Sequence, residues 1–287
     1  MRIALALLIT LVSASGLNLG YLTEHSAVKD LPPLSARRPL VSIRLLLGSR
    51  RWLRGFTVEA TGWLLYVLAL ALAPLSLVQA TAAGGIGILA VMVARMTMTP
   101  LSMRERLAVG TASGGLVLLG ISLAGNHSQG HDAGNLDLGL WIGGSVAAAI
   151  IAVRSLRRFL GGGAAFGTAT GLLFASGDIA TKSSLEGGAH VLFVAVLVAC
   201  YGFGTLVLQA GFQRASPLTT AGIATLLTNA LPIAAGMTIF GEPLPDGWLG
   251  AVRIAAFAAV VLGAVFLAER KHGELGESAE AAPLATT

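Results

Sequence analysis

Apolar runs alternate with short polar segments along most of the chain. A helix that crosses a bilayer needs about 20 mostly apolar residues, and we identify nine runs of roughly this kind. They cover residues 3–22, 56–73, 75–96, 106–123, 138–153, 164–183, 191–212, 218–240 and 248–267. The pattern predicts an all-α, polytopic membrane protein with about nine transmembrane helices.

The composition agrees with a chain that lives in a bilayer rather than in water. Hydrophobic residues make up 55% of the chain and charged residues 11%, whereas a soluble domain carries about 25% charged residues. The one cysteine, Cys200, lies inside an apolar run. The chain therefore forms no internal disulfide and no cysteine-based metal site.

Two polar segments stand out. The longest loop, residues 23–55, is basic, and its middle, residues 40–53, mixes apolar residues with arginines. This middle is either an amphipathic helix on an anionic leaflet or a solvated basic loop. The last residues, 271–287, are small and polar, and we expect a disordered tail.

The positive charges predict the orientation, because short cytoplasmic loops collect Lys and Arg. With the amino terminus outside, sixteen of the 19 Lys and Arg residues fall on the inner side. We therefore expect a multi-pass protein of the plasma (inner) membrane with a cytoplasmic carboxy terminus. The net charge of +5 does not indicate nucleic-acid binding, because the basic residues are spread between the spans and form no solvated patch.

An internal repeat links the two halves of the chain. The matched positions are Pro74 and Pro217, Pro100 and Pro243, and Gly120 and Gly263, each pair 143 residues apart. Upstream, the sequence Ala-Ser-Gly at 14–16 recurs at 175–177, with an offset of 161. The long loop 23–55, which only the first half has, accounts for the difference.

The repeat makes the first four spans equivalent to the last four, with the fifth as a connector. Equivalent helices lie five spans apart, an odd number, so the two copies are inverted. Inverted repeats are a recurring plan of secondary transporters that work by alternating access. The predicted units are a first repeat at 1–125 with the cytoplasmic loop 23–55, a connecting helix at 138–158, a second repeat at 163–269 and the tail at 271–287.

Two short phrases carry a resemblance to a known group. Residues 73–79 read Ala-Pro-Leu-Ser-Leu-Val-Gln, and residues 240–244 read Phe-Gly-Glu-Pro-Leu. In their order and doubled spacing they resemble the drug/metabolite transporter (DMT, EamA-like) superfamily over residues 3–269, which implies a carrier of small solutes. Most members have ten spans, and nine is similar to the NIPA-like magnesium transporter branch. That branch usually has an acidic residue after a glycine of the second helix, where this chain has Trp63 after Gly62.

Ionisable residues at membrane depth are costly and therefore mark candidate pathways. Asp178 and Lys182 are four residues apart in the sixth span and share a helix face. They are either a self-neutralising pair, or Asp178 is a carboxylate that couples transport to protons or cations. Glu59, one turn into the second span, is either a gate, a partner of Arg54, or a side chain that snorkels toward the membrane surface.

Four neutral polar residues and one arginine complete the predicted substrate or ion pathway. Arg253, near the outer end of the ninth span, either binds an anionic substrate or, as we favour, pairs with Asp246 or Asp178. Asn18 and Gln209 are of the type that joins membrane helices. Gln79 and Asn229 stand in the middle of the helices after the Pro-Leu turns, which line the cavity in a carrier of this plan.

No pattern in the sequence predicts an enzyme, a cofactor or a resident metal. The chain has no phosphate-binding G-x-x-x-x-G-K-[ST] sequence and no arrangement of a nucleophile with a base. His127 and His131 lie in a Gly/Asn-rich loop rather than on a helix, so we do not predict a zinc site there.

The leading hypothesis is a carrier that moves a small solute by alternating access, with proton- or gradient-coupled export through Asp178 or Glu59. The first alternative is a magnesium or divalent-cation permease. The second is a non-transporting membrane subunit that binds a partner through its basic loop and tail. The expected partners are the small-molecule or ion substrate and the bilayer, and a homodimer is left open.

Overall fold

The computed structural model describes residues 2–35, 38–72, 85–98, 100–123, 134–184, 192–240 and 247–268, together with residue 82. All regular structure in these residues is helical, as the sequence predicts. The helices are α1 (Arg2–Val28), α2 (Pro39–Gly48), α3 (Arg50–Leu72), α5 (Gly85–Thr97), α6 (Met103–Leu123), α7 (Asn135–Ile151), the short π-helical segment η1 (Ala152–Leu156), α8 (Arg157–Ser184), α9 (Phe193–Phe212), α10 (Pro217–Thr238) and α11 (Trp248–Ala268).

Each predicted span coincides with a helix of the structure, one of them only in part. Of the third predicted span, 75–96, the second half is described as α5, and most of the first half lies outside the described residues. Within the described part of the chain, three segments are long and apolar enough to cross a membrane: Ala4–Val28, Asn135–Ser155 and Phe193–Phe212. The count of nine spans stays a prediction.

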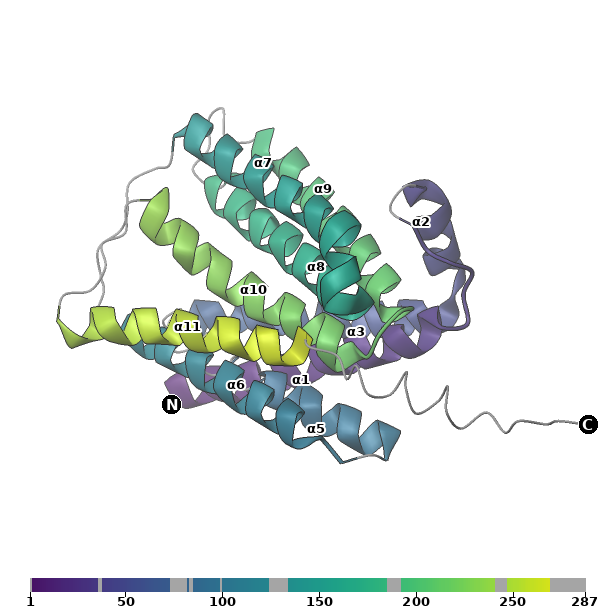
Figure 1. Ribbon diagram of the computed structural model, residues 1–287, viewed down its shortest axis with the longest axis horizontal. Helices are drawn as coiled ribbons and strands as arrows, with labels where there is room; N and C mark the ends of the chain where they lie inside the picture. The colour runs from purple at the N-terminus through teal and green to yellow at the C-terminus, as the bar shows by residue number, and fades with distance from the viewer. Residues whose placement is uncertain are drawn as a thin grey trace, which may run out of the picture.

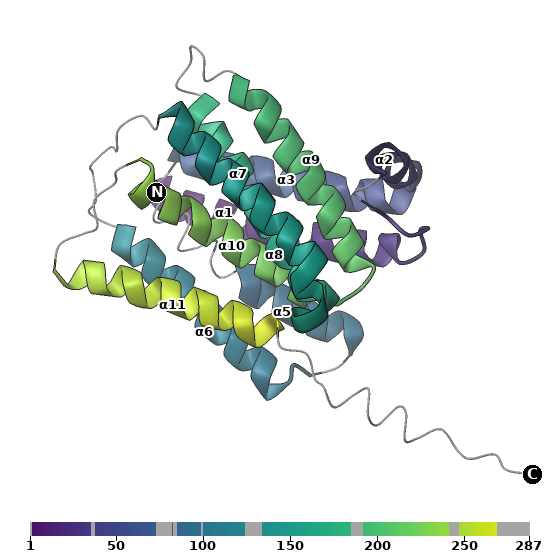
Figure 2. The ribbon, with the colours of Figure 1, turned by 45° about the horizontal axis from the view of Figure 1, so that its top comes forward.

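Helices extend into the predicted basic loop from both sides. α1 continues to Val28 and α3 begins at Arg50, so the segment between them is much shorter than the predicted 23–55. The helix α2 lies in this segment and stands at one end of the bundle, where it contacts α3 and α9 (Figures 1 and 2). The polar side chains at the ends of α1 and α3 therefore belong to helices rather than to a loop.

The predicted helix at 40–53 is divided between two helices at Ser49. Ser49 has an extended backbone (φ −93°, ψ 106°), and its Oγ accepts a hydrogen bond of 3.2 Å from the backbone N–H of Trp52. A serine in this position caps the start of the next helix, here α3. Ile43 and Leu47 are exposed on α2, which suits an interfacial helix, and its contact with a leaflet stays a prediction.

The helices α1 and α3 pack so closely that a Cβ atom would clash at several of their glycines. A Cβ atom placed on Gly20 would lie 2.7 Å from the Cβ of Glu59, and one on Gly62 would lie 2.8 Å from the backbone nitrogen of Leu17. The paired positions run in opposite directions along the two helices, so α1 and α3 are antiparallel. Consecutive membrane spans have this relation.

The helix α8 has in the second half the neighbours that α1 has in the first. It packs against α9 and α10, as α1 packs against α3 and α5 (Figure 1). Again glycines lie at the contacts. A Cβ on Gly167 of α8 would lie 2.6 Å from the carbonyl oxygen of Thr220 in α10, and one on Gly204 of α9 would lie 2.5 Å from the ring of Phe174 in α8.

The helices α6 and α11 lie side by side in both views (Figures 1 and 2). A Cβ on Gly115 would lie 2.9 Å from Ala256 O and Val260 N, and one on Gly263 would lie 2.7 Å from Ala112 Cβ. The two helices are thus antiparallel, and Gly115 meets residues on both sides of the position 143 further along the chain. Equivalent helices of inverted copies would meet in this way, which is compatible with the repeat that the sequence predicts.

The close contact of α1 with α3 makes Gly62→Ala destabilising. The added methyl group would overlap the α1 backbone, and overpacking of this kind costs about 1–3 kcal/mol. We expect a lower midpoint of thermal unfolding for the detergent-purified variant. The matched control is Gly110→Ala in α6, where nothing lies within 4 Å of an added Cβ. Equal midpoints for the two variants would contradict the close approach.

Candidate functional site

Two carboxyl groups face each other across the contact between α1 and α3. Glu24 of α1 is fully buried and Glu59 of α3 is half-buried. Each lies against a glycine of the other helix: a Cβ on Gly55 would lie 2.8 Å from Glu24 Cγ, and one on Gly20 would lie 2.7 Å from Glu59 Cβ. Glu24 and Glu59 interact electrostatically with each other. We call them the acidic pair.

The position of the acidic pair follows from a simple spacing. Gly20 precedes Glu24 by four residues, and Gly55 precedes Glu59 by four residues. Residues four apart lie on one helix face, one turn above the other. In an antiparallel contact, the acid of each helix therefore meets the glycine of the other, and the two carboxyl groups come together.

A side chain from the second half of the chain completes the acidic pair. Gln209 of α9 is fully buried, and its Nε2 donates a hydrogen bond of 2.5 Å to Glu24 Oε2. In the part of the chain that the structure describes, Glu24 Oε1 and Gln209 Oε1 are buried without a hydrogen-bond partner. Buried polar oxygens without a partner cost free energy, so this group of oxygen atoms is suited to a cation.

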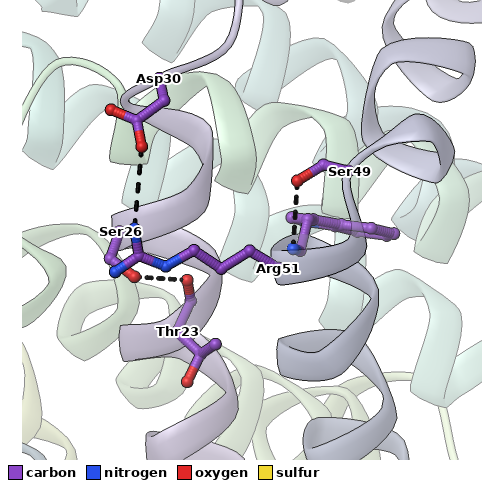
Figure 3. Close-up of polar contacts among 6 residues, drawn as sticks. Thr23, Ser26, Asp30, Ser49 and Arg51 are labelled. Carbon is purple, nitrogen blue, oxygen red and sulfur yellow. Dashed lines mark hydrogen bonds and ion pairs between the residues drawn. The ribbon is translucent and has the colours of Figure 1, made fainter.

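The ion pair recorded among the described residues lies away from the acidic pair. Arg51, at the start of α3, lies 3.7 Å from Asp30, which follows α1, and both side chains are mostly exposed. Figure 3 shows this contact beside the bond from Ser26 Oγ to Thr23 O on α1. Within the described residues, no ion pair with Lys or Arg neutralises the acidic pair, and the sequence's pairing of Glu59 with Arg54 is not what is seen.

The three tyrosines of the chain interact with Asp178, and one of them also with the acidic pair. The hydroxyl of Tyr201 in α9 donates a hydrogen bond to Asp178 in α8. Tyr66 lies within electrostatic range of Asp178, and Tyr21 lies within electrostatic range of Asp178, Tyr201 and both members of the acidic pair. Titratable side chains of four helices are thus gathered inside the bundle.

The structure brings together three of the eight residues that the sequence analysis selected. Glu59, Asp178 and Gln209 belong to this polar interior. Gln79 lies outside the described residues, and the side chain of Lys182 does too, so the predicted contact of Asp178 with Lys182 is not described.

The remaining three selected residues form their described hydrogen bonds away from the acidic pair and Asp178. Asn18 is buried and donates to the carbonyl oxygens of Ala14 and Gly85, each at 2.8 Å, which ties α1 to α5. Asn229 donates to the carbonyl of a residue one turn earlier in its own helix. Arg253 is fully buried in α11 and donates to Ser122 at the end of α6, through Nη2 to the backbone oxygen at 2.9 Å and through Nε to Oγ at 3.2 Å.

Sequence reasoning missed Glu24 because it placed the end of the first helix at Leu22. Glu24 then fell in the basic loop, where an acidic residue is unremarkable. The shared spacing of Gly20 with Glu24 and of Gly55 with Glu59 was the available signal. It shows that both acids lie on glycine-bearing helix faces, if α1 is allowed one more turn.

Comparison with known proteins gives one informative likeness. The chain is 24% identical over 281 residues to the "Probable magnesium transporter NIPA9" of Arabidopsis thaliana, which covers 90% of this chain and 80% of that protein. No family profile matches the chain, and no solved structure matches it significantly. This weak homology and the apolar helices support a multi-pass membrane protein of the transporter class.

Replacing the buried acid of α1 tests whether it lacks a counter-charge. Glu24→Gln keeps the shape of the side chain but removes its negative charge. Because leaving a buried polar group unpaired costs about 1–3 kcal/mol, removing an uncompensated charge should stabilise the protein. We expect a higher thermal unfolding midpoint than that of the unaltered protein in buffer free of divalent cations. Asp137→Asn, an exposed acid in the first turn of α7, should not raise the midpoint. A lower midpoint for Glu24→Gln would show that the carboxylate is already compensated.

Proposed function

We propose that the chain transports cations across the membrane and that the acidic pair with Gln209 is its central binding site. The observation that carries the proposal is the meeting of two carboxyl groups inside the bundle with no described basic partner. Intramembrane acids that face a bundle interior commonly mark ion pathways. We infer Mg²⁺ as the substrate and the plasma (inner) membrane as the location.

The chemistry of the acidic pair suits Mg²⁺. This ion is typically bound by one or two carboxylates and keeps several of its waters, and two ionised carboxylates balance its charge. Within the described residues no group of three or more His, Cys, Asp or Glu side chains forms a metal site. A site of only two acids and an amide oxygen suits a transported ion better than a permanently bound metal. The name of the Arabidopsis relative supports the same substrate.

The helix α3 provides its acid at a different position from the one that the NIPA-like resemblance implies. Trp63, which stands where an acidic residue is usual, is 53% exposed on the outside of the bundle. Glu59 lies one turn earlier on α3 and faces α1. Although α3 departs from the pattern at Trp63, it still has an inward-facing carboxylate, that of Glu59.

The place of the site supports alternating access. Glu24 and Glu59 come from the predicted first repeat, and Gln209 comes from the predicted second repeat. In transporters with inverted repeats, the substrate binds where the repeats meet. A movement of one half against the other would change the coordination around the ion and its exposure to the two sides.

Flux measurements test the proposal directly. In proteoliposomes, we expect Mg²⁺ uptake by the unaltered protein, with Glu24→Gln and Glu59→Gln both reduced at least about tenfold. Loss of one carboxylate that an ion needs at this depth removes more than the 1.4 kcal/mol that a factor of ten represents.

The control for the flux measurement is Asp137→Asn, which makes the same acid-to-amide change on an exposed helix start and should transport normally. Normal Mg²⁺ flux in both acidic-pair variants would overturn the assignment of the site. Absence of any flux from the unaltered protein would favour the non-transporting subunit instead.

A second candidate function is a proton-coupled carrier of a small organic solute, and Asp178 is the observation that favours it. Its bond from Tyr201 joins α8 to α9, and a carboxylate accepts from a hydroxyl more strongly than a protonated acid does. Proton binding would therefore loosen one contact inside the second half.

The carrier alternative predicts a distinct phenotype for Asp178→Asn. A neutral amide cannot bind and release a proton, so accumulation driven by a pH gradient should fall to background, while exchange of the same solute down its own gradient persists. Proteoliposomes with and without an imposed pH gradient measure both. Undiminished proton-driven accumulation would exclude Asp178 as the coupling residue.

A further inference from the structure

The side chain of Gln213 holds the end of α1 from the end of α9. Its Oε1 accepts a hydrogen bond of 2.9 Å from the backbone N–H of Leu34. Its Nε2 donates to the carbonyl oxygens of Val28 at 2.8 Å and of Leu31 and Pro32, each at 3.2 Å. The last carbonyl groups of a helix have no partner within the helix, and here one amide side chain binds the carbonyl of Val28 at the end of α1 and those of Leu31 and Pro32 in the segment that follows.

Two further contacts run beside Gln213. The ring of Phe212 meets the rings of Tyr21 and His25 edge-on, with centroids 6.3 Å and 5.6 Å apart. His25 Nε2 lies 3.2 Å from the carbonyl oxygen of Ala215, so the tautomer with a proton on Nε2 donates this bond. We call the contacts of residues 212, 213 and 215 with residues 21, 25 and 28–34 the Gln213 seam.

The Gln213 seam lies one helical turn from the proposed cation site on both helices. Gln213 follows Gln209 by four residues on α9, and Val28 follows Glu24 by four residues on α1. These are the helix ends that the distribution of Lys and Arg places on the cytoplasmic side. On both helices the seam therefore lies between the acidic pair and the expected cytoplasmic end.

The seam joins parts that belong to different halves of the chain. The end of α9 is attached to its own half, because Arg214 lies over the ring of Phe166 in α8, 4.9 Å from its centroid. α1 is attached to α3 through the glycine contacts at Gly20 and Gly62. A movement between the halves would therefore separate the seam and leave both attachments intact.

We propose that the Gln213 seam is the inner gate of the transport pathway and that Gln213 is the residue that holds it closed. The proposal rests on the assignment of the acidic pair as the cation site, whose exposure to the cytoplasm it regulates. Opening exchanges four hydrogen bonds of one side chain for bonds to water and needs no helix to unfold.

Accessibility of a cysteine in the seam tests the gate without any transport. The reporter is Val28→Cys in a Cys200→Ser background, because Val28 is fully buried. A membrane-impermeant maleimide is added to inside-out vesicles, and the labelling rate is measured. With Gln213→Ala we expect labelling to rise about tenfold, which corresponds to a shift of 1.4 kcal/mol in the equilibrium between closed and open forms.

Two further variants keep the result interpretable. Gln213→Asn retains the amide on a shorter arm that cannot reach all four backbone groups, so its labelling should also rise. Ser216→Ala is the matched control in the same turn: Ser216 caps α10 by accepting from Thr219 N and takes no part in the seam. Its labelling should stay at the level of the reporter alone.

The outcomes separate the gate from the cation assignment. Labelling of both Gln213 variants at the reporter's own rate would overturn the gate, and so would an equal rise in Ser216→Ala, which would indicate a general loosening of the turn. If Gln213 variants open but Mg²⁺ flux never depends on the acidic pair, the gate stands and the substrate assignment fails. If Mg²⁺ flux depends on the acidic pair and labelling does not change in the Gln213 variants, the substrate assignment stands and the gate fails.

Discussion

The close approach of α1 and α3 is the constraint on which the rest of the interior depends. Glycines at 20, 55 and 62 remove the side chains that would separate the two backbones, and the fixed spacing of four residues then sets Glu24 beside Glu59. Two acids in an apolar bundle are costly. The tight packing of the helices around them brings the two carboxyl groups within hydrogen-bonding range of each other.

The sequence predicts the helices well because apolar length is a local property. The predicted spans 3–22 and 56–73 correspond to α1 and α3, but both helices continue beyond their apolar runs. An apolar run ends at the first charges, whereas a helix ends where its backbone bonds end. Glu24 lies after the end of the apolar run at residue 22 but before the end of α1 at Val28. The hydrophobic pattern alone therefore assigned it to a loop.

Partners of polar side chains are predicted less well, because they come from distant parts of the chain. Spacing on one helix suggests Lys182 for Asp178, which stays a prediction because the side chain of Lys182 lies outside the described residues, but it cannot indicate Tyr201 on the next helix, which donates to Asp178. Arg253 donates to Ser122, 131 residues away, a partner that no spacing on one helix indicates, whereas its expected partner Asp246 lies outside the described residues. No single sequence shows which helix faces meet, so Gln209 was predicted for the pathway without its hydrogen bond to Glu24.

The two interfaces of α1 differ in kind, and the difference bears on how the molecule would move. Toward α3 the helices approach closely at Gly62, where an added Cβ would lie 2.8 Å from the backbone nitrogen of Leu17 and where Ser13 Oγ donates a hydrogen bond of 2.7 Å to the Gly62 oxygen. Toward α9 it is made by long side chains, among them Gln209, Phe212 and Gln213. An interface of the first kind moves as one body, because any separation opens a void. An interface of the second kind can part by rotation of a few side chains. The acidic pair therefore stays assembled on α1 and α3 while its third ligand and its cover, both on α9, are the parts free to leave.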